Sequence, residues 1–134
     1  MRTTIVGAGP SGTTAALLLA RAGHDVTLVD RDAGPGTDGT WDRVGVMQFL
    51  LPQGLRGPGR LFLESRLPDV HQALLDAGAA YGAVPRGAPP FTAGLHLRRC
   101  TMERVLWACA DREDRKSTRL NSSHTDISRM PSSA

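Results

Sequence analysis

The hydrophobic and polar positions of the first thirty residues follow three successive patterns. Residues 3–6 are apolar and β-branched, which is typical of a short buried strand. Residues 11–22 are rich in alanine and leucine and are followed by Gly23, which favours a helix that ends at a glycine. Residues 25–29 again have the composition of a strand and lead into Asp30. This order predicts a right-handed βαβ unit with two parallel strands.

The rest of the chain predicts shorter elements. Glycines and prolines indicate loops at residues 31–40 and 53–60, and residues 41–51 fit no single pattern. The other expected elements are helices over residues 60–66, 68–77 and 101–111, the last capped by Thr101, a strand over 95–97 and an irregular segment over 81–91. The predicted fold class is α/β: an incomplete Rossmann-like domain in which a helical insertion follows the βαβ unit.

The last 21 residues differ in composition from the rest. Residues 1–113 hold all 15 glycines and only two serines, whereas residues 114–134 hold six serines, the only lysine and no glycine. In one reading frame, 18 of these 21 residues match the translation of a common sequencing-library adapter and its continuation. We therefore expect residues 1–113 to be a truncated natural domain and residues 114–134 to be an unstructured, adapter-derived tail. A natural serine-rich tail is the alternative.

Composition narrows the class of protein. The 134 residues are 40% hydrophobic and 22% charged, as in soluble globular domains, and no apolar run is long enough to span a bilayer. Most of the net charge of +3 comes from the tail, so we expect no nucleic-acid partner. Cys100 and Cys109 are too few for a disulfide framework and lack zinc-site spacing. We expect free thiols in a cytoplasmic protein without a metal site.

The glycine-rich turn between the first strand and the helix carries the candidate chemistry. It reads G-A-G-P-S-G at residues 7–12. In a dinucleotide-binding unit, Gly7 allows the tight turn, Gly9 lets a pyrophosphate approach the backbone, and Gly12 lets the helix pack against the strands. The helix N-terminus offers unpaired N–H groups and a partial positive charge to phosphates. Asp30, 18 residues beyond Gly12, can accept hydrogen bonds from the adenosine ribose.

The spacing of this motif leaves alternatives open. A glycine-rich turn can simply pack a strand against a helix, and FAD and NAD domains share the same G-x-G-x-x-G pattern. Two features favour FAD: the motif begins at residue 7, and a long helical and loop segment follows the second strand, where a nicotinamide domain continues with further βα units. The rival functions are a nicotinamide-dependent dehydrogenase domain and a truncated fragment without activity.

Residues 1–31 (M-R-T-T-I-V-G-A-G-P-S-G, continuing to A-R-A-G-H-D-V-T-L-V-D-R) resemble the N-terminus of FAD-dependent oxidoreductases related to aromatic-ring hydroxylases and squalene-type epoxidases. R-V-G-V-M-Q at residues 43–48 and L-R-R-C-T-M-E-R-V-L at residues 97–106 are similar to FAD-lining segments of the para-hydroxybenzoate hydroxylase group. The resemblance implies that Arg43 and Arg99 contact the flavin nucleotide. The expected cofactor-binding residues are Gly7, Gly9, Pro10, Ser11, Gly12, Asp30, Arg31, Arg43 and Arg99.

The resemblance implies a flavin-dependent oxidoreductase, in the first place a monooxygenase that uses FAD, NAD(P)H and oxygen on a small organic substrate; reduction of an isoprenoid double bond is a further option. It covers residues 1–113, and the later D-G and G-D motifs that complete the FAD site in the family are absent from this sequence. We therefore expect this chain to be inactive by itself. No catalytic residue is named, because the flavin carries the oxygen chemistry. The sequence indicates neither the substrate nor an oligomeric state.

Other chemistry-bearing side chains are expected to have structural roles. Trp41 and Trp107 are interpreted as packing residues, and Glu103 as an acid on a helix surface. His71 and His96 lack the partner spacing of a catalytic triad or a metal site, so solvated or capping roles are expected for both.

Overall fold

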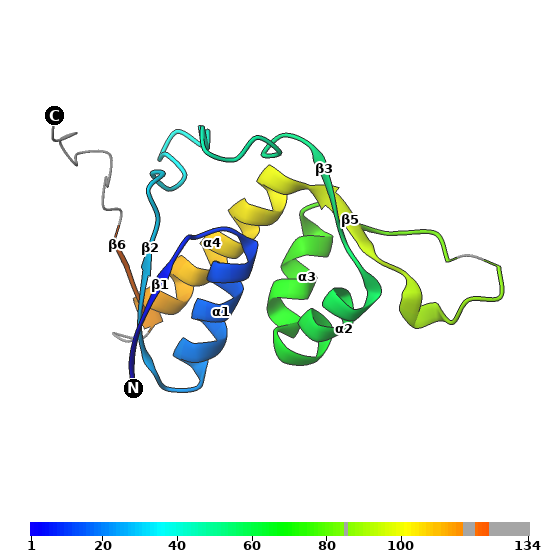
Figure 1. Cartoon of the computed structure of the whole chain (residues 1–134), viewed down its shortest axis with the longest axis horizontal. Coiled ribbons are helices and arrows are strands. Elements are labelled where there is room, and N and C mark those ends of the chain that lie inside the picture. The colour runs from blue at the N-terminus through cyan, green and yellow to red at the C-terminus, as the bar shows by residue number, and fades with distance from the viewer. Residues whose placement is uncertain (85, 117–119, 124–134) are drawn as a thin grey trace, which may run out of the picture. The chain divides into compact units, whose positions relative to one another are not determined.

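The computed structural model describes residues 1–84, 86–116 and 120–123, and the chain divides into two compact units (Figure 1). Unit 1 comprises Met1–Met47 and Trp107–Ala134, and unit 2 comprises Gln48–Leu106. Each unit contains a three-stranded sheet. The long helix α4 (Arg99–Lys116) contributes residues to both units.

Unit 1 is built on a parallel sheet in which β2 (Asp25–Val29) lies between β1 (Arg2–Val6) and β6 (Leu120–Ser123). Helix α1 (Pro10–Arg21) connects β1 to β2 and lies against the sheet in Figure 1. Arg2 stands opposite Asp25 at one end of the β1–β2 pair, and Val6 stands opposite Val29 at the other. The βαβ unit with parallel strands, predicted from the sequence, is confirmed.

The core of unit 1 lies on one face of this sheet. Val26 and Leu28 alternate along β2 and are buried, as are Ala16 and Leu17 of α1. The two periods match, because every second strand residue and every third or fourth helix residue faces the same interior. On the other face, the side chain of Val6 is 78% exposed. That face of β1 is therefore open to solvent in the described part of the chain.

Two stretches of the predicted tail are described, and there the structure differs from an unstructured chain. Residues 114–116 complete α4, and Leu120–Ser123 forms β6, which pairs with β2. Without β6, the backbone N–H and C=O groups along one edge of β2 would be unpaired. Because these hydrogen bonds join backbone groups, the pairing depends little on the side chains of β6. Residues 117–119 and 124–134 of the predicted tail lie outside the described residues.

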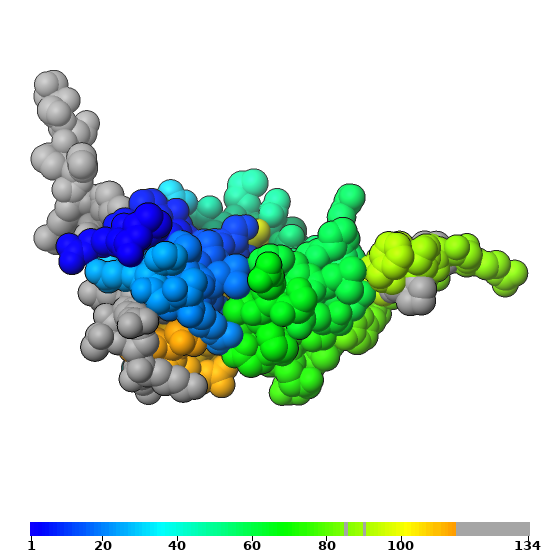
Figure 2. Space-filling model, turned by 90° about the horizontal axis from the view of Figure 1, so that it is seen from below, coloured from blue at the N-terminus to red at the C-terminus, as the bar shows by residue number. Residues whose placement is uncertain are grey.

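Unit 2 contains a small antiparallel sheet and two helices. In the sheet, β5 (Leu95–Arg98) lies between β3 (Pro52–Leu55) and β4 (Ala80–Tyr81). The other elements are α2 (Gly57–Arg66), α3 (Pro68–Asp76) and the 3₁₀ turn η1 (Pro90–Thr92). In the space-filling view α2 and α3 form one continuous green surface (Figure 2).

The structure corrects two expectations in unit 2. Pro52–Leu55 was expected to lead into a loop at residues 53–60 but forms β3, because a proline at the first residue of an edge strand removes no ladder hydrogen bond that the sheet needs. Helix α4 begins at Arg99 rather than behind a Thr101 cap, and it runs on to Lys116.

Several apolar side chains of unit 2 are almost completely buried, and they are Leu67, Val70, Leu74, Leu95 and Met102. Both cysteines are free thiols, and Cys109 is buried. None of the helices in the described part of the chain has the length and apolar character that a bilayer crossing requires.

The buried leucine of α3 allows a direct test of this packing. Leu74→Ala removes a side chain with no exposed surface, so we expect the free energy of unfolding to fall by about 2–4 kcal/mol. Leu61→Ala is the matched control, because Leu61 of α2 is 38% exposed and should lose about 1 kcal/mol or less. Urea unfolding followed by circular dichroism measures both, and equal losses would contradict the packing described for α3.

Candidate functional site

The turn between β1 and α1 needs glycine at two positions for different reasons. Gly7 has a φ of +103°, a left-handed conformation that side-chain-bearing residues rarely adopt. Its N–H donates to the carbonyl of Val29 at 2.7 Å, which ties the turn to the end of β2. A Cβ at Gly12 would overlap the carbonyl oxygen of Gly7, which belongs to the backbone and cannot rotate away. The close approach expected of Gly12 is therefore present in the structure.

The N-terminus of α1 is open to an anion. Gly9 is the N-cap residue in an extended conformation (φ −72°, ψ −178°), so its backbone shape alone does not demand glycine, but the missing side chain leaves the turn accessible. Helix α1, all of which is described, has no side-chain N-cap hydrogen bond and no acidic residue in its first turn. Pro10 and Ser11 begin the helix. The positive end of its dipole is therefore not neutralised by the helix's own side chains.

Asp30 lies beside this turn, as the sequence predicted. Its Oδ2 accepts a hydrogen bond of 2.5 Å from the N–H of Ala8, the second residue of the motif. Its Oδ1 accepts a hydrogen bond of 2.9 Å from the N–H of Asp32. The side chain is 6% exposed. The carboxylate thus stands at the carboxyl ends of β1 and β2, where ligands of parallel α/β sheets bind.

Arg43 neutralises this buried carboxylate. Its Nη2 lies 2.6 Å from Oδ2 of Asp30, and its Nε lies 3.2 Å from Oδ2 of Asp32. The Arg43 side chain is only 5% exposed. A buried carboxylate of this kind requires both a countercharge and hydrogen bonds, and the segment that follows β2 provides them by folding back onto the turn.

The carbonyl oxygen of Ala8 is a second shared acceptor in the hydrogen-bond network around Asp30 and Arg43. It accepts from Oγ1 of Thr13 at 3.1 Å, from Nη1 of Arg43 at 3.4 Å and from the indole N–H of Trp107 at 3.3 Å. The ring centroids of Trp41 and Trp107 lie 5.8 Å apart in an edge-to-face arrangement. The guanidinium carbon of Arg43 lies 5.8 Å from the ring centroid of Trp41. The packing roles expected for both tryptophans agree with these contacts, which brace the turn from the α4 side.

The surroundings of Asp30 shift its acidity. Burial acts to raise the pKa of the carboxyl, but the N–H groups of Asp32 and Ala8 and the charge of Arg43 outweigh it and hold the pKa below its ordinary value. Asp30 is therefore an anion at neutral pH, and both of its carboxylate oxygens are hydrogen-bond acceptors.

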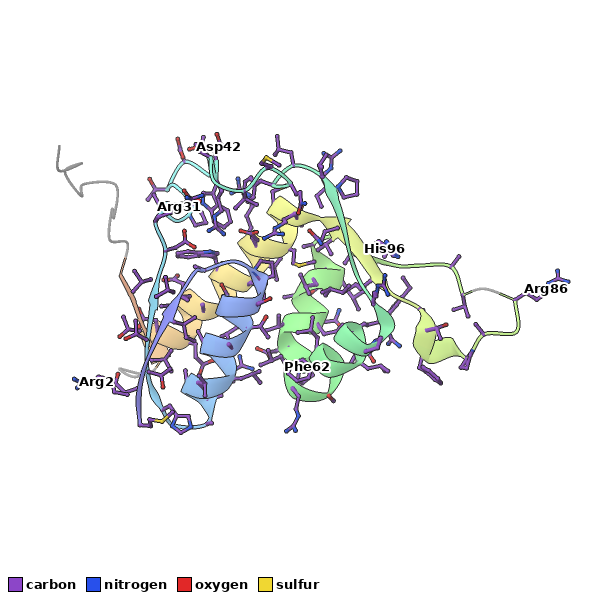
Figure 3. All side chains as sticks on the ribbon, in the orientation of Figure 1. Arg2, Arg31, Asp42, Phe62, Arg86 and His96 are labelled. Carbon is purple, nitrogen blue, oxygen red and sulfur yellow. The ribbon has the colours of Figure 1, made fainter. Side chains whose placement is uncertain are left out.

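Arg31 and Arg99 have different surroundings. Arg31 lies on the loop after β2 (Figure 3), is 64% exposed, and its guanidinium covers Gly45, where an added Cβ would overlap it. Arg99 belongs to unit 2, where its Nε donates to Oε1 of Glu103 at 2.7 Å. Glu103 is fully buried, so the expectation of a surface acid is wrong. Its position four residues after Arg99 was a readable sign of this ion pair.

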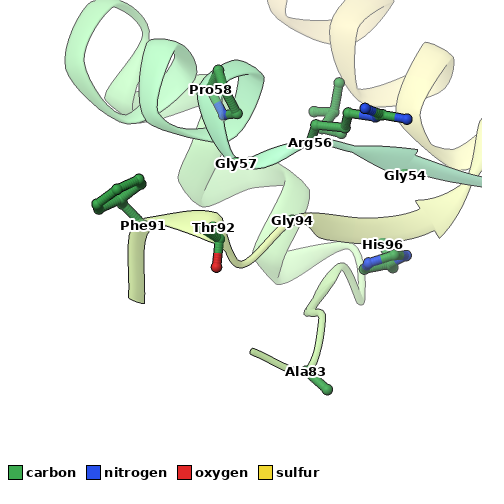
Figure 4. Close-up of a pocket in the computed structure, with 10 residues that line it drawn as sticks. Gly54, Arg56, Gly57, Pro58, Ala83, Phe91, Thr92, Gly94 and His96 are labelled. Carbon is green, nitrogen blue, oxygen red and sulfur yellow. The ribbon is translucent and has the colours of Figure 1, made fainter. Parts of the chain in front are cut away.

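Unit 2 also contains features that the sequence did not predict. His71, expected to be solvated or to cap a helix, is buried, with its Nε2 3.5 Å from Oε1 of Glu64. A pocket of about 630 Å³ lies between the β3–α2 junction and the segment before β5 (Figure 4). Its lining residues are Gly54, Leu55, Arg56, Gly57, Pro58, Ala83, Phe91, Thr92, Gly94 and His96.

Comparison with known proteins gives this geometry a family. A family model described as FAD dependent oxidoreductase (DAO) matches residues 2–96. The chain therefore belongs to the FAD-dependent oxidoreductase family. Residues of the chain are similar to a D-amino acid dehydrogenase of Rhizobium rhizogenes, with 51% identity over 59 residues, 44% of this chain and 14% of that protein. They are 43% identical over 54 residues to the NAD-dependent dihydropyrimidine dehydrogenase subunit PreT of Escherichia coli, covering 40% of this chain and 12% of that protein.

Solved structures share the fold over a larger part of the chain. The tetrameric form of 2-methyl-3-hydroxypyridine-5-carboxylic acid oxygenase aligns with a TM-score of 0.61 at 17% identity, over 92% of this chain and 31% of that chain. The p-nitrophenol 4-monooxygenase PnpA of Pseudomonas putida aligns with a TM-score of 0.58 at 17% identity, over 90% and 31% respectively. This chain thus spans about a third of the length of these structures.

The acidity of Asp30 predicts how stability depends on pH. Because its pKa is lower in the folded chain than the ordinary 3.8, the carboxylate's stabilising contribution is present above pH 3.8 and is lost as the pH falls through the folded value. Asp30→Asn leaves Arg43 without this partner, so we expect unfolding at pH 7 to require about 3 kcal/mol less free energy, a difference that shrinks below pH 3.8. Urea unfolding across this pH range measures the difference.

The matched control is Asp25→Asn, at the other end of β2. Asp25 forms an exposed ion pair with Arg2, whose side chain is 84% exposed, so its loss should change stability by less than about 1 kcal/mol. If the two asparagine variants lost the same stability at pH 7, the assignment of Asp30 as a buried, paired carboxylate would be wrong.

Proposed function

We propose that unit 1 supplies the adenosine and pyrophosphate half of the FAD site of a flavin-dependent monooxygenase that acts with NAD(P)H and oxygen on a small organic substrate. The observation that carries this proposal is Asp30 at the mouth of the glycine turn, bonded to the N–H of Ala8. It brings an acceptor for ribose and an open helix N-terminus to the same edge of one parallel sheet.

The residues of this edge fit the dinucleotide part of FAD. Gly7 and Gly12 shape the turn, and a Cβ built at Gly7 would meet no atom within 4 Å apart from its own chain neighbours, so the turn is open at this position. Gly9, Pro10 and Ser11 would face the pyrophosphate, and Asp30 would accept from the ribose. FAD supplies the redox chemistry when bound, while these residues bind and orient it.

Three arginines complete the proposed set. Arg31 stands on the loop after β2 with a side chain that is 64% exposed, and its guanidinium would contact the phosphates of the nucleotide. Arg99 of unit 2 would contact the nucleotide as its resemblance to the family segment implies. Arg43 belongs to the set through its ion pair with Asp30.

A monooxygenase is favoured over a dehydrogenase by the extent of the similarity. The solved monooxygenases align over 90% or more of this chain and therefore include both units, whereas the dehydrogenases match fewer than half of its residues. A D-amino acid dehydrogenase, rather than the nicotinamide-dependent dehydrogenase considered from sequence, is the second candidate, and the 51% identity over 59 residues supports it. Both candidates use the same adenosine half of the cofactor.

We also propose that the enzyme is cytoplasmic, because both cysteines of this chain are free thiols.

Binding of ADP tests the proposed site in the 134-residue chain. We expect ADP to bind weakly, with a Kd of about 1 mM, and to shift the amide resonances of residues 7–13 and of Asp30 in NMR titrations. Asp30→Asn should weaken binding about tenfold, because a hydrogen bond to a charged group is lost. Asp25→Asn should leave it unchanged. Shifts confined to unit 2, or equal affinities of the two variants, would contradict the site.

The reaction is tested with a longer gene product. We propose that the chain alone retains no stoichiometric flavin and oxidises no nicotinamide, because it spans only about a third of the length of the solved monooxygenases with which it aligns. A longer gene product that contains this chain should carry FAD, oxidise NAD(P)H and consume oxygen when a substrate is present. Oxidation of D-amino acids without oxygen consumption would instead support the dehydrogenase, and a flavin spectrum from the short chain would contradict its inactivity.

A further inference from the structure

The hydrogen bonds of Asp30 leave little of its carboxylate for a ligand. An ionised carboxylate offers about four lone-pair positions, two on each oxygen. Oδ2 already accepts from the N–H of Ala8 at 2.5 Å and from Nη2 of Arg43 at 2.6 Å. Oδ1 accepts from the N–H of Asp32 at 2.9 Å. Within the described part of the chain, one acceptor position on Oδ1 therefore remains.

Arg43 is held in place on several sides. Besides Asp30, its guanidinium donates to Oδ2 of Asp32 at 3.2 Å and to the carbonyl of Ala8 at 3.4 Å, and it stands 5.8 Å from the Trp41 ring centre. These partners come from the turn, from the residues after β2 and from the loop that precedes Arg43. A guanidinium that bonds in several directions within one plane cannot turn toward a phosphate without breaking this set.

We infer that Arg43 is a positioning residue that limits Asp30 to one hydrogen bond with the adenosine ribose, so that the site recognises one of the two ribose hydroxyl groups through Asp30. This inference rests on the proposed function. It gives Arg43 a role that acts through Asp30, in place of the direct nucleotide contact that the family resemblance implies.

The physical reason is the division of the two carboxylate oxygens. Arg43 and Ala8 already donate to Oδ2 of Asp30. The carboxylate therefore cannot accept from one ribose hydroxyl group on each of its two oxygens. Lysine at position 43 would keep the charge but, as a compact ammonium group on a flexible stem, would not hold Asp30, Asp32 and Ala8 together. Oδ2 would then gain an acceptor position, and the second hydroxyl group could bind there.

The test compares three nucleotides on the 134-residue chain: ADP, 2′-deoxy-ADP and 3′-deoxy-ADP. In the unmodified protein, we expect one deoxy analogue to bind about tenfold more weakly than ADP and the other to bind within about twofold of it. In Arg43→Lys, we expect both analogues to bind more weakly than ADP. Arg2→Lys is the matched control, because Arg2 pairs with an aspartate at the far end of β2 and should keep the original pattern.

Each of the other outcomes contradicts one specific claim about Arg43, Asp30 or the nucleotide site. If both analogues were equally weakened in the unmodified protein, or if Arg43→Lys kept the original pattern, Arg43 would not limit Asp30 and the inference alone would fail. If ADP bound but neither analogue differed from it, Asp30 would not contact ribose. If ADP did not bind at all, the proposed function would fail together with the inference. The measurements on the unmodified protein need no variant to fold.

Discussion

The ion pair between Asp30 and Arg43 is the interaction on which the geometry of the candidate site depends. It joins the end of β2 to a residue 13 positions later and, through the N–H and carbonyl of Ala8, to the turn that opens α1. Burying two charges costs a desolvation penalty that their attraction often only offsets, so the value of such a pair lies in placement rather than in net stability. Here it keeps an anion, already desolvated and oriented, beside an open helix N-terminus. In the proposed site, such a fixed carboxylate would reduce the ordering that nucleotide binding requires.

The βαβ unit and the place of Asp30 were predictable from sequence because their determinants are local. A strand period, a helix period and glycines at three spacings all agree over thirty residues, and parallel pairing then brings the end of β2 to the turn. The partner of Asp30 was not predictable in this way. Arg43 lies in a segment without helix or strand period, and no spacing rule connects a loop arginine to a strand-end carboxylate. The resemblance to a family pointed to Arg43 as a functional residue, but its contacts came only from the structure.

In unit 2, more of the structure depends on contacts between distant residues than on local sequence signals. Helix α3 was predicted because a proline begins it and a glycine follows it. Helix α2 was predicted from Arg60 but begins at Gly57, and β3 was missed, because the glycines and prolines of residues 53–60 indicated a loop. Its pairing with β5 places Gly54 opposite His96, a position where a Cβ would lie 3.3 Å from the imidazole. A strand of this kind depends on its partner rather than on its own propensity. The burial of Glu103 was missed for a related reason: a charged residue is buried only where a partner such as Arg99 accompanies it, and that depends on packing.

In the proposed function, the residues that indicate the cofactor differ from the residues that determine the reaction. The glycine turn, Asp30 and Arg43 belong to unit 1, and in the proposed site they would bind the adenosine part of FAD, which takes no part in oxidation. Residues that bind this half would therefore indicate the cofactor rather than the reaction. The reaction depends on groups that face the flavin ring and the substrate. The alignment with solved structures over 90% or more of this chain shows that the shared fold extends beyond the βαβ unit into unit 2.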